Sequence, residues 1–133
     1  MESKKEIVIM SKYGNRRCQY NGIVFDSVHE MERYKELLLL ERAGEISNLK
    51  LQVKFELIPE QREQSTEIYK RGPKAGQFKP GKIVEKSCVY IADFVYIRNG
   101  QRIVEDAKGM KTKEYRLKKK LLLYRHGIRI VET

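Results

Sequence analysis

The chain has 133 residues, of which 41% are hydrophobic and 35% are charged, and an excess of lysine and arginine gives it a formal net charge of +10. This size and apolar content predict one folded domain spanning residues 1–133. No run approaches the roughly 20 apolar residues of a membrane-spanning helix, and we find no signal peptide, so we expect a cytoplasmic protein. The basic excess favours a nucleic acid partner over a membrane surface.

The sequence lacks the cysteine and histidine patterns of a zinc site. Cys18 and Cys88 stand far apart without a neighbouring ligand, and without an export signal we expect both to be reduced thiols. His29 and His126 have no metal-ligand partner at useful spacing, so we expect them to be structural.

The N-terminal part of the chain is predicted to contribute one short strand. Residues 1–12 carry no sustained pattern and are expected to form a loose leader. Residues 20–26 favour a strand, with Asn21-Gly22 as a turn before or within it.

A helix is predicted from Ser27 to about Gly44. The segment from Ser27 to Glu30 matches a capping box, apolar residues then recur at helical spacing, and Gly44 suits the left-handed residue that ends many helices. Residues 49–58 alternate between apolar and polar side chains, which predicts a strand closed by Pro59.

A polar and basic insertion follows at residues 60–86, in which proline and glycine recur. We expect either a long loop or a mobile hairpin, because segments of this length without a pattern are usually functional or disordered. Its cations include Lys70, Arg71, Lys74, Lys79 and Lys82.

The C-terminal part is predicted to contain a hairpin, a helix and a last strand. Residues 87–98 and 101–108 surround Asn99-Gly100, the strongest short-range hairpin signal. Residues 112–126 form a basic helix, and residues 128–131 a strand that this crossover places parallel to the preceding one. The fold class is therefore α/β, a mixed sheet flanked by helices. The apolar side of the second helix is expected to carry Leu117, Leu121, Leu122 and Tyr124.

The hairpin register brings two acidic residues together. A two-residue turn at Asn99-Gly100 places Asp93 opposite Asp106, and alternation then puts Asp93, Asp106 and Lys108 on one face and Glu105 on the other. Facing carboxylates about 5 Å apart repel each other, more strongly beside apolar neighbours. A bound Mg²⁺, for which Mn²⁺ would substitute, would relieve this repulsion, and Lys108 would stabilise charge on a phosphate or orient a water molecule.

Each of these residues also has a purely structural explanation. The two aspartates could share a proton or pair with lysines, and Lys108 could be a solvated strand end. Their combination in one register favours a site.

The sequence around these residues resembles a known superfamily. Asp93, a hairpin and Asp106-Ala107-Lys108, flanked by helices in αβββαβ order, resemble the PD-(D/E)XK nucleases, although Ala92 replaces the usual proline before the first aspartate. Residues 12–133 are also similar to small phage and prophage proteins described as Holliday-junction-resolvase-like, and to the endonuclease subunit of some transposases. This second similarity is carried by residues 25–30, 51–55, 91–96 and 104–109.

The resemblance implies a restriction-endonuclease-like core and a Mg²⁺-dependent endodeoxyribonuclease acting inside a bacterial host. Asp93, Asp106 and the Ala107 carbonyl would hold the metal, and Glu30 would complete the site, although Glu30 is also the last residue of the capping box. Glu32 and Glu36 are weaker alternatives on other helix faces. Gln52 is a possible orienting group or a surface residue of its strand.

The resemblance also implies branched DNA, such as a Holliday junction, as the substrate, and a homodimer that cuts two strands. Tyr115 is expected in the core. A DNA-binding module without catalysis, or a nuclease subunit of a larger recombination complex, stays open as an alternative. The residues expected to contact DNA are Lys111, Lys113, Arg116 and Lys119 on the basic helix and Lys70, Arg71 and Lys74 in the insertion.

Overall fold

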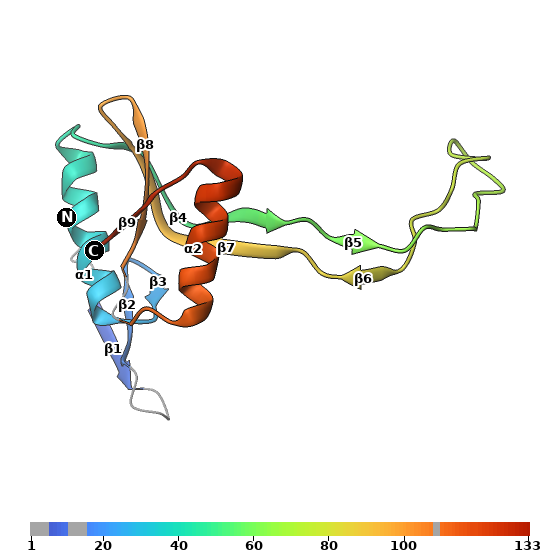
Figure 1. Ribbon diagram of the computed structural model, residues 1–133. Helices are drawn as coiled ribbons and strands as arrows, with labels where there is room; N and C mark the ends of the chain where they lie inside the picture. The colour runs from blue at the N-terminus through green and yellow to red at the C-terminus, as the bar shows by residue number, and fades with distance from the viewer. Residues whose placement is uncertain (1–5, 11–15, 108–109) are drawn as a thin grey trace.

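The computed structural model describes residues 6–10, 16–107 and 110–133 and shows a small body from which a long arm projects (Figure 1). None of the helices in these described segments is long and apolar enough to cross a membrane. The elements are β1 (Glu6–Met10), β2 (Arg16–Tyr20), β3 (Ile23–Phe25), α1 (Val28–Arg42), β4 (Ser47–Ile58), β5 (Gln61–Arg62), β6 (Ile83–Glu85), β7 (Cys88–Arg98), β8 (Gln101–Asp106), α2 (Lys113–His126) and β9 (Ile130–Glu132).

The body is built on a mixed four-stranded sheet in the order β4-β7-β8-β9. The first three strands are antiparallel and β9 runs parallel to β8, so the predicted parallel pairing across the α2 crossover is confirmed. The two helices cover opposite faces, because Met31 and Leu37 of α1 pack in one apolar cluster and Tyr115 and Leu122 of α2 pack in the other (Figure 1). The predicted α/β class, a mixed sheet flanked by helices, is therefore confirmed.

The β7–β8 hairpin has the predicted turn and register. Asn99 and Gly100 both have positive φ, 51° and 75°, as a two-residue hairpin turn with the right twist requires. The paired residues run from Arg98 opposite Gln101 to Phe94 opposite Glu105, and the ladder ends one pair before Asp93 and Asp106. The strand β8 ends at Asp106, and Lys108 lies outside the described residues.

Both helices begin at a hydroxyl cap, which the sequence predicts for Ser27 and the structure adds for Thr112. The Ser27 hydroxyl accepts a hydrogen bond from Glu30 N at 3.1 Å, and the Thr112 hydroxyl accepts one from Tyr115 N at 3.1 Å. Gly127 ends α2 with a φ of 68°. These local signals fix where each helix begins or ends, independently of what it packs against.

The predicted apolar side of α2 is partly wrong. Tyr115 and Leu122, two turns apart, face the sheet, which confirms the core position expected for Tyr115. Leu117 is 58% exposed and Tyr124 is 90% exposed, although both were expected to pack. Each lies two positions after a buried residue, and two helical positions correspond to a rotation of about 200°, so both side chains point away from the sheet.

The N-terminal segment is more ordered than predicted. Glu6–Met10, expected in a loose leader, forms β1 and pairs with β2. The single strand expected at residues 20–26 is instead a hairpin, because Asn21 and Gly22 have φ of 56° and 78° and turn the chain back between β2 and β3.

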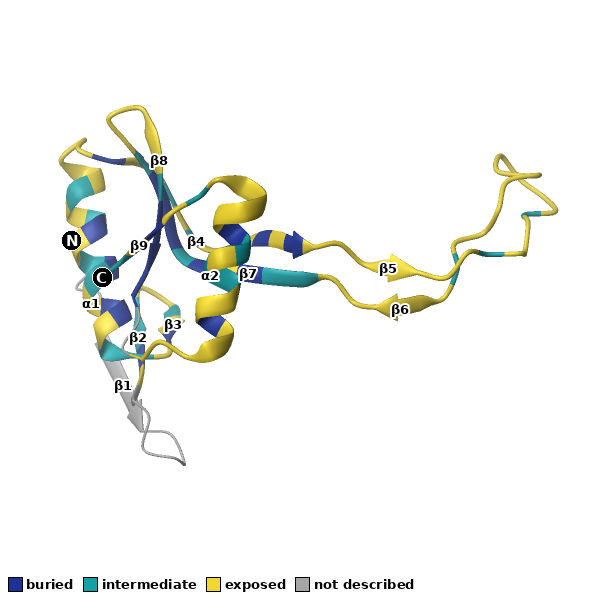
Figure 2. Cartoon of the chain, in the orientation of Figure 1, coloured by how far each residue is buried: buried dark blue, intermediate teal, exposed yellow. Residues whose placement is uncertain are grey.

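The basic insertion is a hairpin rather than a loop. β5 pairs with β6, and an isolated bridge joins Ile68 to Phe78 near the tip. Residues 59–87 form the arm, which stands out from the body and is exposed along almost its whole length (Figure 2).

Candidate active site

In both β4 and β7, the side chains change the face of the sheet on which they pack, and they do so at the same level. The candidate site lies at this level. Leu51 of β4 packs on the α1 side, whereas Val53 packs on the α2 side. Residues two apart share a face in a regular strand, so the strand must twist between them. Gln52 lies there with a φ of 52°, a left-handed conformation that non-glycine residues rarely adopt.

The same change of face occurs in β7 around Asp93. Ala92 and Val95 both pack on the α2 side although they are three residues apart, and Phe94 packs on the α1 side. The strict alternation that we assumed for β7 is therefore broken. One expected apolar neighbour of Asp93 is not a core residue, because Ile91 is 42% exposed.

Four of the predicted site residues come together at this level. Gln52 Nε2 donates to Glu30 Oε1 at 3.2 Å and lies 3.5 Å from Asp93 Oδ1. The backbone N–H of Ala107 donates to Asp93 Oδ2 at 2.9 Å. The site thus gathers groups from α1, β4, β7 and the end of β8. Glu30 is buried, and the contact with Gln52 gives its carboxylate a role beyond the helix cap.

Asp106 is fully buried and is held from the α2 side of the sheet. The Tyr90 hydroxyl donates to Asp106 Oδ2 at 2.5 Å. Burial raises the pKa of Tyr90, and this hydrogen bond and the charges of Asp106 and Asp93 raise it further. Tyr90 was missed in the sequence, because regular alternation gives no reason to place it against Asp106.

The acidic residues of the described chain do not form a ready-made metal cage. Within residues 6–10, 16–107 and 110–133, no three histidine, cysteine or acidic side chains are grouped closely enough to hold a metal ion. The candidate donors are nevertheless all oxygens, from Glu30, Asp93, Asp106 and the Ala107 carbonyl, which is the chemistry that Mg²⁺ prefers. The position expected for Lys108, at the rim of this site, lies outside the described residues.

Glu105 lies on the opposite face, as predicted, and has a structural role. Its buried carboxylate accepts hydrogen bonds from Arg33 Nε, from Arg33 Nη2 at 3.0 Å and from the Tyr96 hydroxyl at 2.6 Å. Burial alone would raise the pKa of Glu105, but the bonds from Arg33 and Tyr96 outweigh it and the pKa is lowered. Burial, followed by the bond to Glu105, raises the pKa of Tyr96 to about 12.

A family model described as "Protein of unknown function (DUF1064)" matches residues 10–130, which include every part of this site. The chain belongs to the DUF1064 family. No curated protein and no solved structure matches the sequence.

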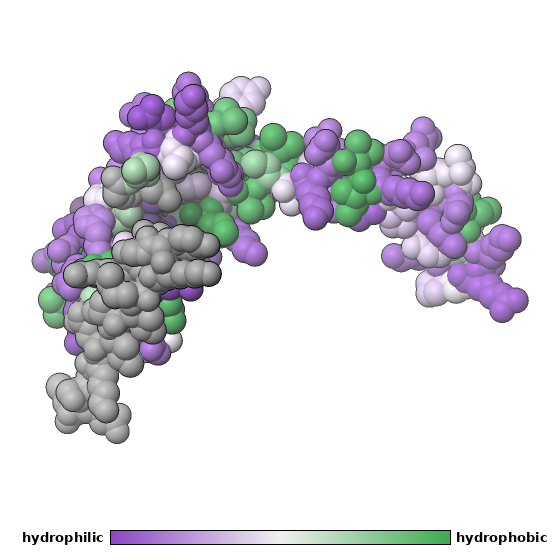
Figure 3. Space-filling view, turned by 90° about the horizontal axis from the view of Figure 1, so that it is seen from below, coloured by the Kyte–Doolittle hydropathy of each residue, from purple (hydrophilic) through white to green (hydrophobic). Residues whose placement is uncertain are grey.

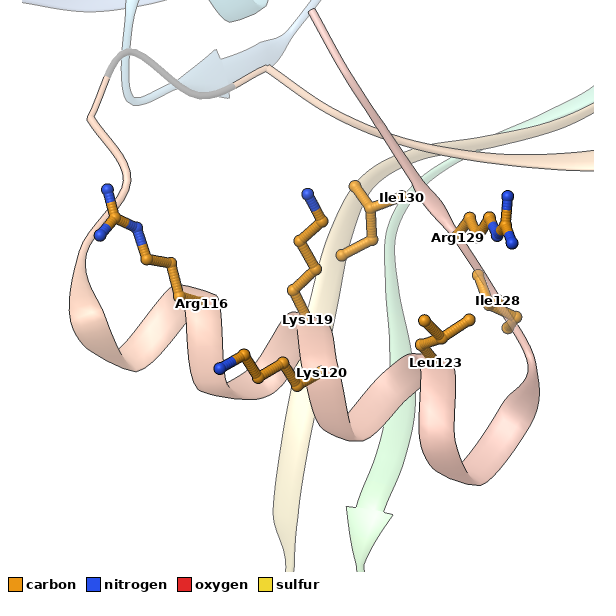
Figure 4. Close-up of a pocket in the computed structure, with 7 residues that line it drawn as sticks. All are labelled: Arg116, Lys119, Lys120, Leu123, Ile128, Arg129 and Ile130. Carbon is orange, nitrogen blue, oxygen red and sulfur yellow. The ribbon is translucent and has the colours of Figure 1, made fainter.

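The DUF1064 chain carries a basic groove between α2 and β9 (Figure 4). Its volume is about 560 Å³, and Figure 4 shows Arg116, Lys119 and Lys120 on the helix, with Ile128, Arg129 and Ile130 on the segment that leads into β9. Two of the predicted DNA contacts, Arg116 and Lys119, line it, whereas Arg129 was missed as a candidate. The lining residues are Arg116, Lys119, Lys120, Leu123, Ile128, Arg129 and Ile130.

Two predicted DNA contacts in this DUF1064 protein are ion-paired. Glu132 of β9 pairs with Lys119 and, at 3.1 Å, with Lys111. The bond from Lys119 and then that from Lys111 lower the pKa of Glu132. The pairs hold the middle of α2 and the segment before it against β9, while Lys113 is exposed.

The remaining candidates lie away from the site. Glu32 and Glu36 pair with Lys35 and Arg33 on the exposed surface of α1. The third group of predicted DNA contacts is exposed at the distal end of the arm and consists of Lys70, Arg71 and Lys74.

The histidines and cysteines of the DUF1064 chain also lie outside the candidate site. His29 Nε2 lies 2.8 Å from the Thr133 carbonyl oxygen, and His126 Nε2 lies 2.6 Å from that of Glu56, which supports the structural roles expected for them. Both cysteines are free thiols, as predicted.

Proposed function

We propose that this protein is a metal-dependent endonuclease that hydrolyses phosphodiester bonds of DNA, with a restriction-endonuclease-like core of the PD-(D/E)XK type. The observation that carries the proposal is the link from Glu30 through Gln52 to Asp93, beside Ala107 and Asp106. These residues come from four different elements. A strained backbone at Gln52 supports the proposal further, because such strain is concentrated at functional sites.

The donor set suits Mg²⁺, with Mn²⁺ as a substitute. Mg²⁺ is often held by one or two carboxylates together with water and substrate phosphate oxygens. Asp93, Asp106 and the Ala107 carbonyl would therefore be sufficient without a third acidic ligand. When bound, the cation polarises the phosphate and lowers the pKa of a water molecule.

The residues of the chain would position the reacting groups. The Ala107 N–H fixes one oxygen of Asp93 and Tyr90 fixes one oxygen of Asp106, so each carboxylate keeps a defined orientation. Gln52 would hold Glu30 close to Asp93, at a position from which its carboxylate can bind a water molecule. Lys108, two residues after Asp106, would stabilise negative charge on the phosphate.

The cations of α2 and the basic groove support DNA as the substrate. Phosphate neutralisation is the main source of affinity for nucleic acids, and the chain carries a net charge of +10. Lys113 and Arg116 follow directly after the acidic site, so they would position the backbone beside the bond that is cut. Branched DNA and a homodimer belong to the same proposal, because cutting both strands of a symmetric junction requires two sites.

A cleavage assay tests the proposal. The protein is incubated with linear duplex, single-stranded, flap and four-way DNA, with Mg²⁺ and with EDTA, and light scattering gives its oligomeric state on the junction. We expect Mg²⁺-dependent cleavage that is abolished in Asp106→Asn and Lys108→Ala, while both variants still bind DNA. Glu32→Gln, an exposed acid on α1, is the control and should cut normally. Parental cleavage by a folded Asp106→Asn variant would refute the assignment.

A DNA-binding module without catalysis is the second candidate. The full burial of Asp106 and its bond to Tyr90 favour it, since a buried hydrogen-bonded acid can be purely structural. Calorimetric titration with Mg²⁺, carried out with and without DNA, separates the two candidates. A nuclease binds the ion, whereas a simple DNA-binding module has no need of it.

A further inference from the structure

The arm, defined as residues 59–87, is a separate two-stranded ladder that follows on from β4 and β7 beyond the central sheet. Val53 pairs with Ala92 in the body, Gln61 pairs with Glu85 within the arm, and the bridge between Ile68 and Phe78 lies near the tip. The two segments on either side of the tip thus pair at intervals between the sheet and the tip, with single-residue shifts in register. Backbone bonds such as Glu63 N to the Lys82 carbonyl at 2.9 Å support the pairing between them.

The arm exposes apolar side chains that a free protein would normally bury. Phe78 is 67% exposed, and Ile83 and Val84 are exposed as well. Figure 3 shows hydrophobic surface among the hydrophilic side chains of the arm. Isolated two-stranded hairpins are only marginally stable in water, and the exposed Phe78 is available to contact a partner.

The charge of the distal arm favours a polyanion as the occupant. Between residues 68 and 82 the sequence has no acidic residue, and its cations are Lys70, Arg71, Lys74, Lys79 and Lys82. Two of them, Lys74 and Lys79, lie 6.0 and 5.8 Å from the centre of the Tyr69 ring. A second copy of a chain with net charge +10 would be repelled by this surface, whereas phosphate would be attracted.

The shape of the arm matches duplex DNA. The major groove admits a two-stranded β-ribbon. A strand rises about 3.3 Å per residue, so the residues from Pro59 to Ile68 reach roughly 33 Å, which is about one helical turn of DNA.

We propose that the arm is a β-ribbon that binds duplex DNA with its tip about one helical turn beyond the body. The tip cations contact phosphates, and Phe78 contacts base edges in the major groove. This inference rests on the DNA binding of the proposed function but not on cleavage.

Fluorescence anisotropy in EDTA, with duplexes of about 12 and about 30 base pairs, tests the proposal. Lys70→Ala/Lys74→Ala should weaken binding to the long duplex on the order of tenfold and leave the short one nearly unchanged, and the slope of log affinity against log salt should fall by about 2. The control, Arg42→Ala/Arg98→Ala, removes the same charge from exposed positions outside the arm and should not distinguish the two lengths.

Phe78→Ser separates base contact from charge. It should weaken binding to the long duplex without changing the salt slope, because it removes no cation. Equal effects of the arm and control variants at both lengths would overturn the proposal. It would also be overturned if the arm variant converted a dimer to a monomer with unchanged affinity per protomer, since the arm would then bind a second copy. If cleavage is never seen but the length dependence holds, only the nuclease proposal fails.

Discussion

Gln52 Nε2 lies 3.5 Å from Oδ1 of Asp93, at the level where β4 and β7 both change the face of the sheet that their side chains cover. The left-handed backbone of Gln52 turns its amide towards Asp93 and Glu30 together. A strand with regular geometry would have continued the alternation through this position. The strain and the contact therefore belong to one feature, which the following variants test.

Replacing Gln52 with glycine or alanine separates strain from contact. Glycine accepts a φ of 52° and alanine does not, so we expect Gln52→Gly to be more stable than Gln52→Ala by about 1 kcal/mol. Both variants lose the amide, and their cleavage rates should fall at least about tenfold. Denaturant unfolding and cleavage assays measure the two effects, with Gln101→Ala, an exposed position outside the arm, as control. Parental cleavage by Gln52→Gly would show that the amide is not needed.

Mg²⁺ should stabilise the free protein. A ligand that binds only the folded state adds about 1.4 kcal/mol at ten times its dissociation constant, which raises the melting temperature by roughly 4 °C. We expect this shift in the parent and its loss in Asp93→Asn/Asp106→Asn. Glu32→Gln/Glu67→Gln, which removes two exposed acids, should keep the shift. The same shift in all three proteins would place the metal elsewhere.

Glu105 should stabilise the fold at neutral pH but not in acid. The pKa of Glu105 is lowered in the folded protein. Its stabilising free energy is therefore fully present above the pKa of the unfolded chain, about 4.3, and is lost as the pH falls through the pKa of the folded protein. Glu105→Gln should cost about 2–3 kcal/mol at pH 7, because Arg33 then loses its buried partner. The difference from the parent should narrow below about pH 4.

Denaturant unfolding at several pH values measures this effect. The control is Glu36→Gln, which removes the exposed partner of Arg33 and should cost less than about 1 kcal/mol. An equal cost for the two variants would contradict the role assigned to the buried pair.

Gly81 should be essential for the arm but not for the body. A Cβ at this position would lie 1.7 Å from the Glu63 carbonyl oxygen, so Gly81→Ala must push the two arm strands apart. We expect faster amide hydrogen exchange in residues 60–86 and an unchanged melting temperature of the body. The exposed Gln64→Ala should leave exchange unchanged. If Gly81→Ala exchanges like the parent, the close approach of the strands is not required.

The sequence by itself determined the features whose chemistry is local. Ser27 and Thr112 cap their helices, and Asn99-Gly100 sets a turn that places Phe94 opposite Glu105. These signals depend on a few neighbouring residues, so they can be recognised without knowing what the element packs against. The same register led to Asp93 and Asp106 as neighbours on adjacent strands.

Only the tertiary structure decided which side chains meet across the fold. Glu30 and Gln52 belong to α1 and β4. Nothing in either local segment specifies that β4 changes face at Gln52 and so brings the two side chains together. Tyr90 became a partner of Asp106 because β7 does not alternate regularly, and Tyr124 proved exposed because packing chose the face of α2 that carries Leu122. Such contacts depend on the relative placement of distant elements, which the burial of the whole core determines and no local pattern encodes.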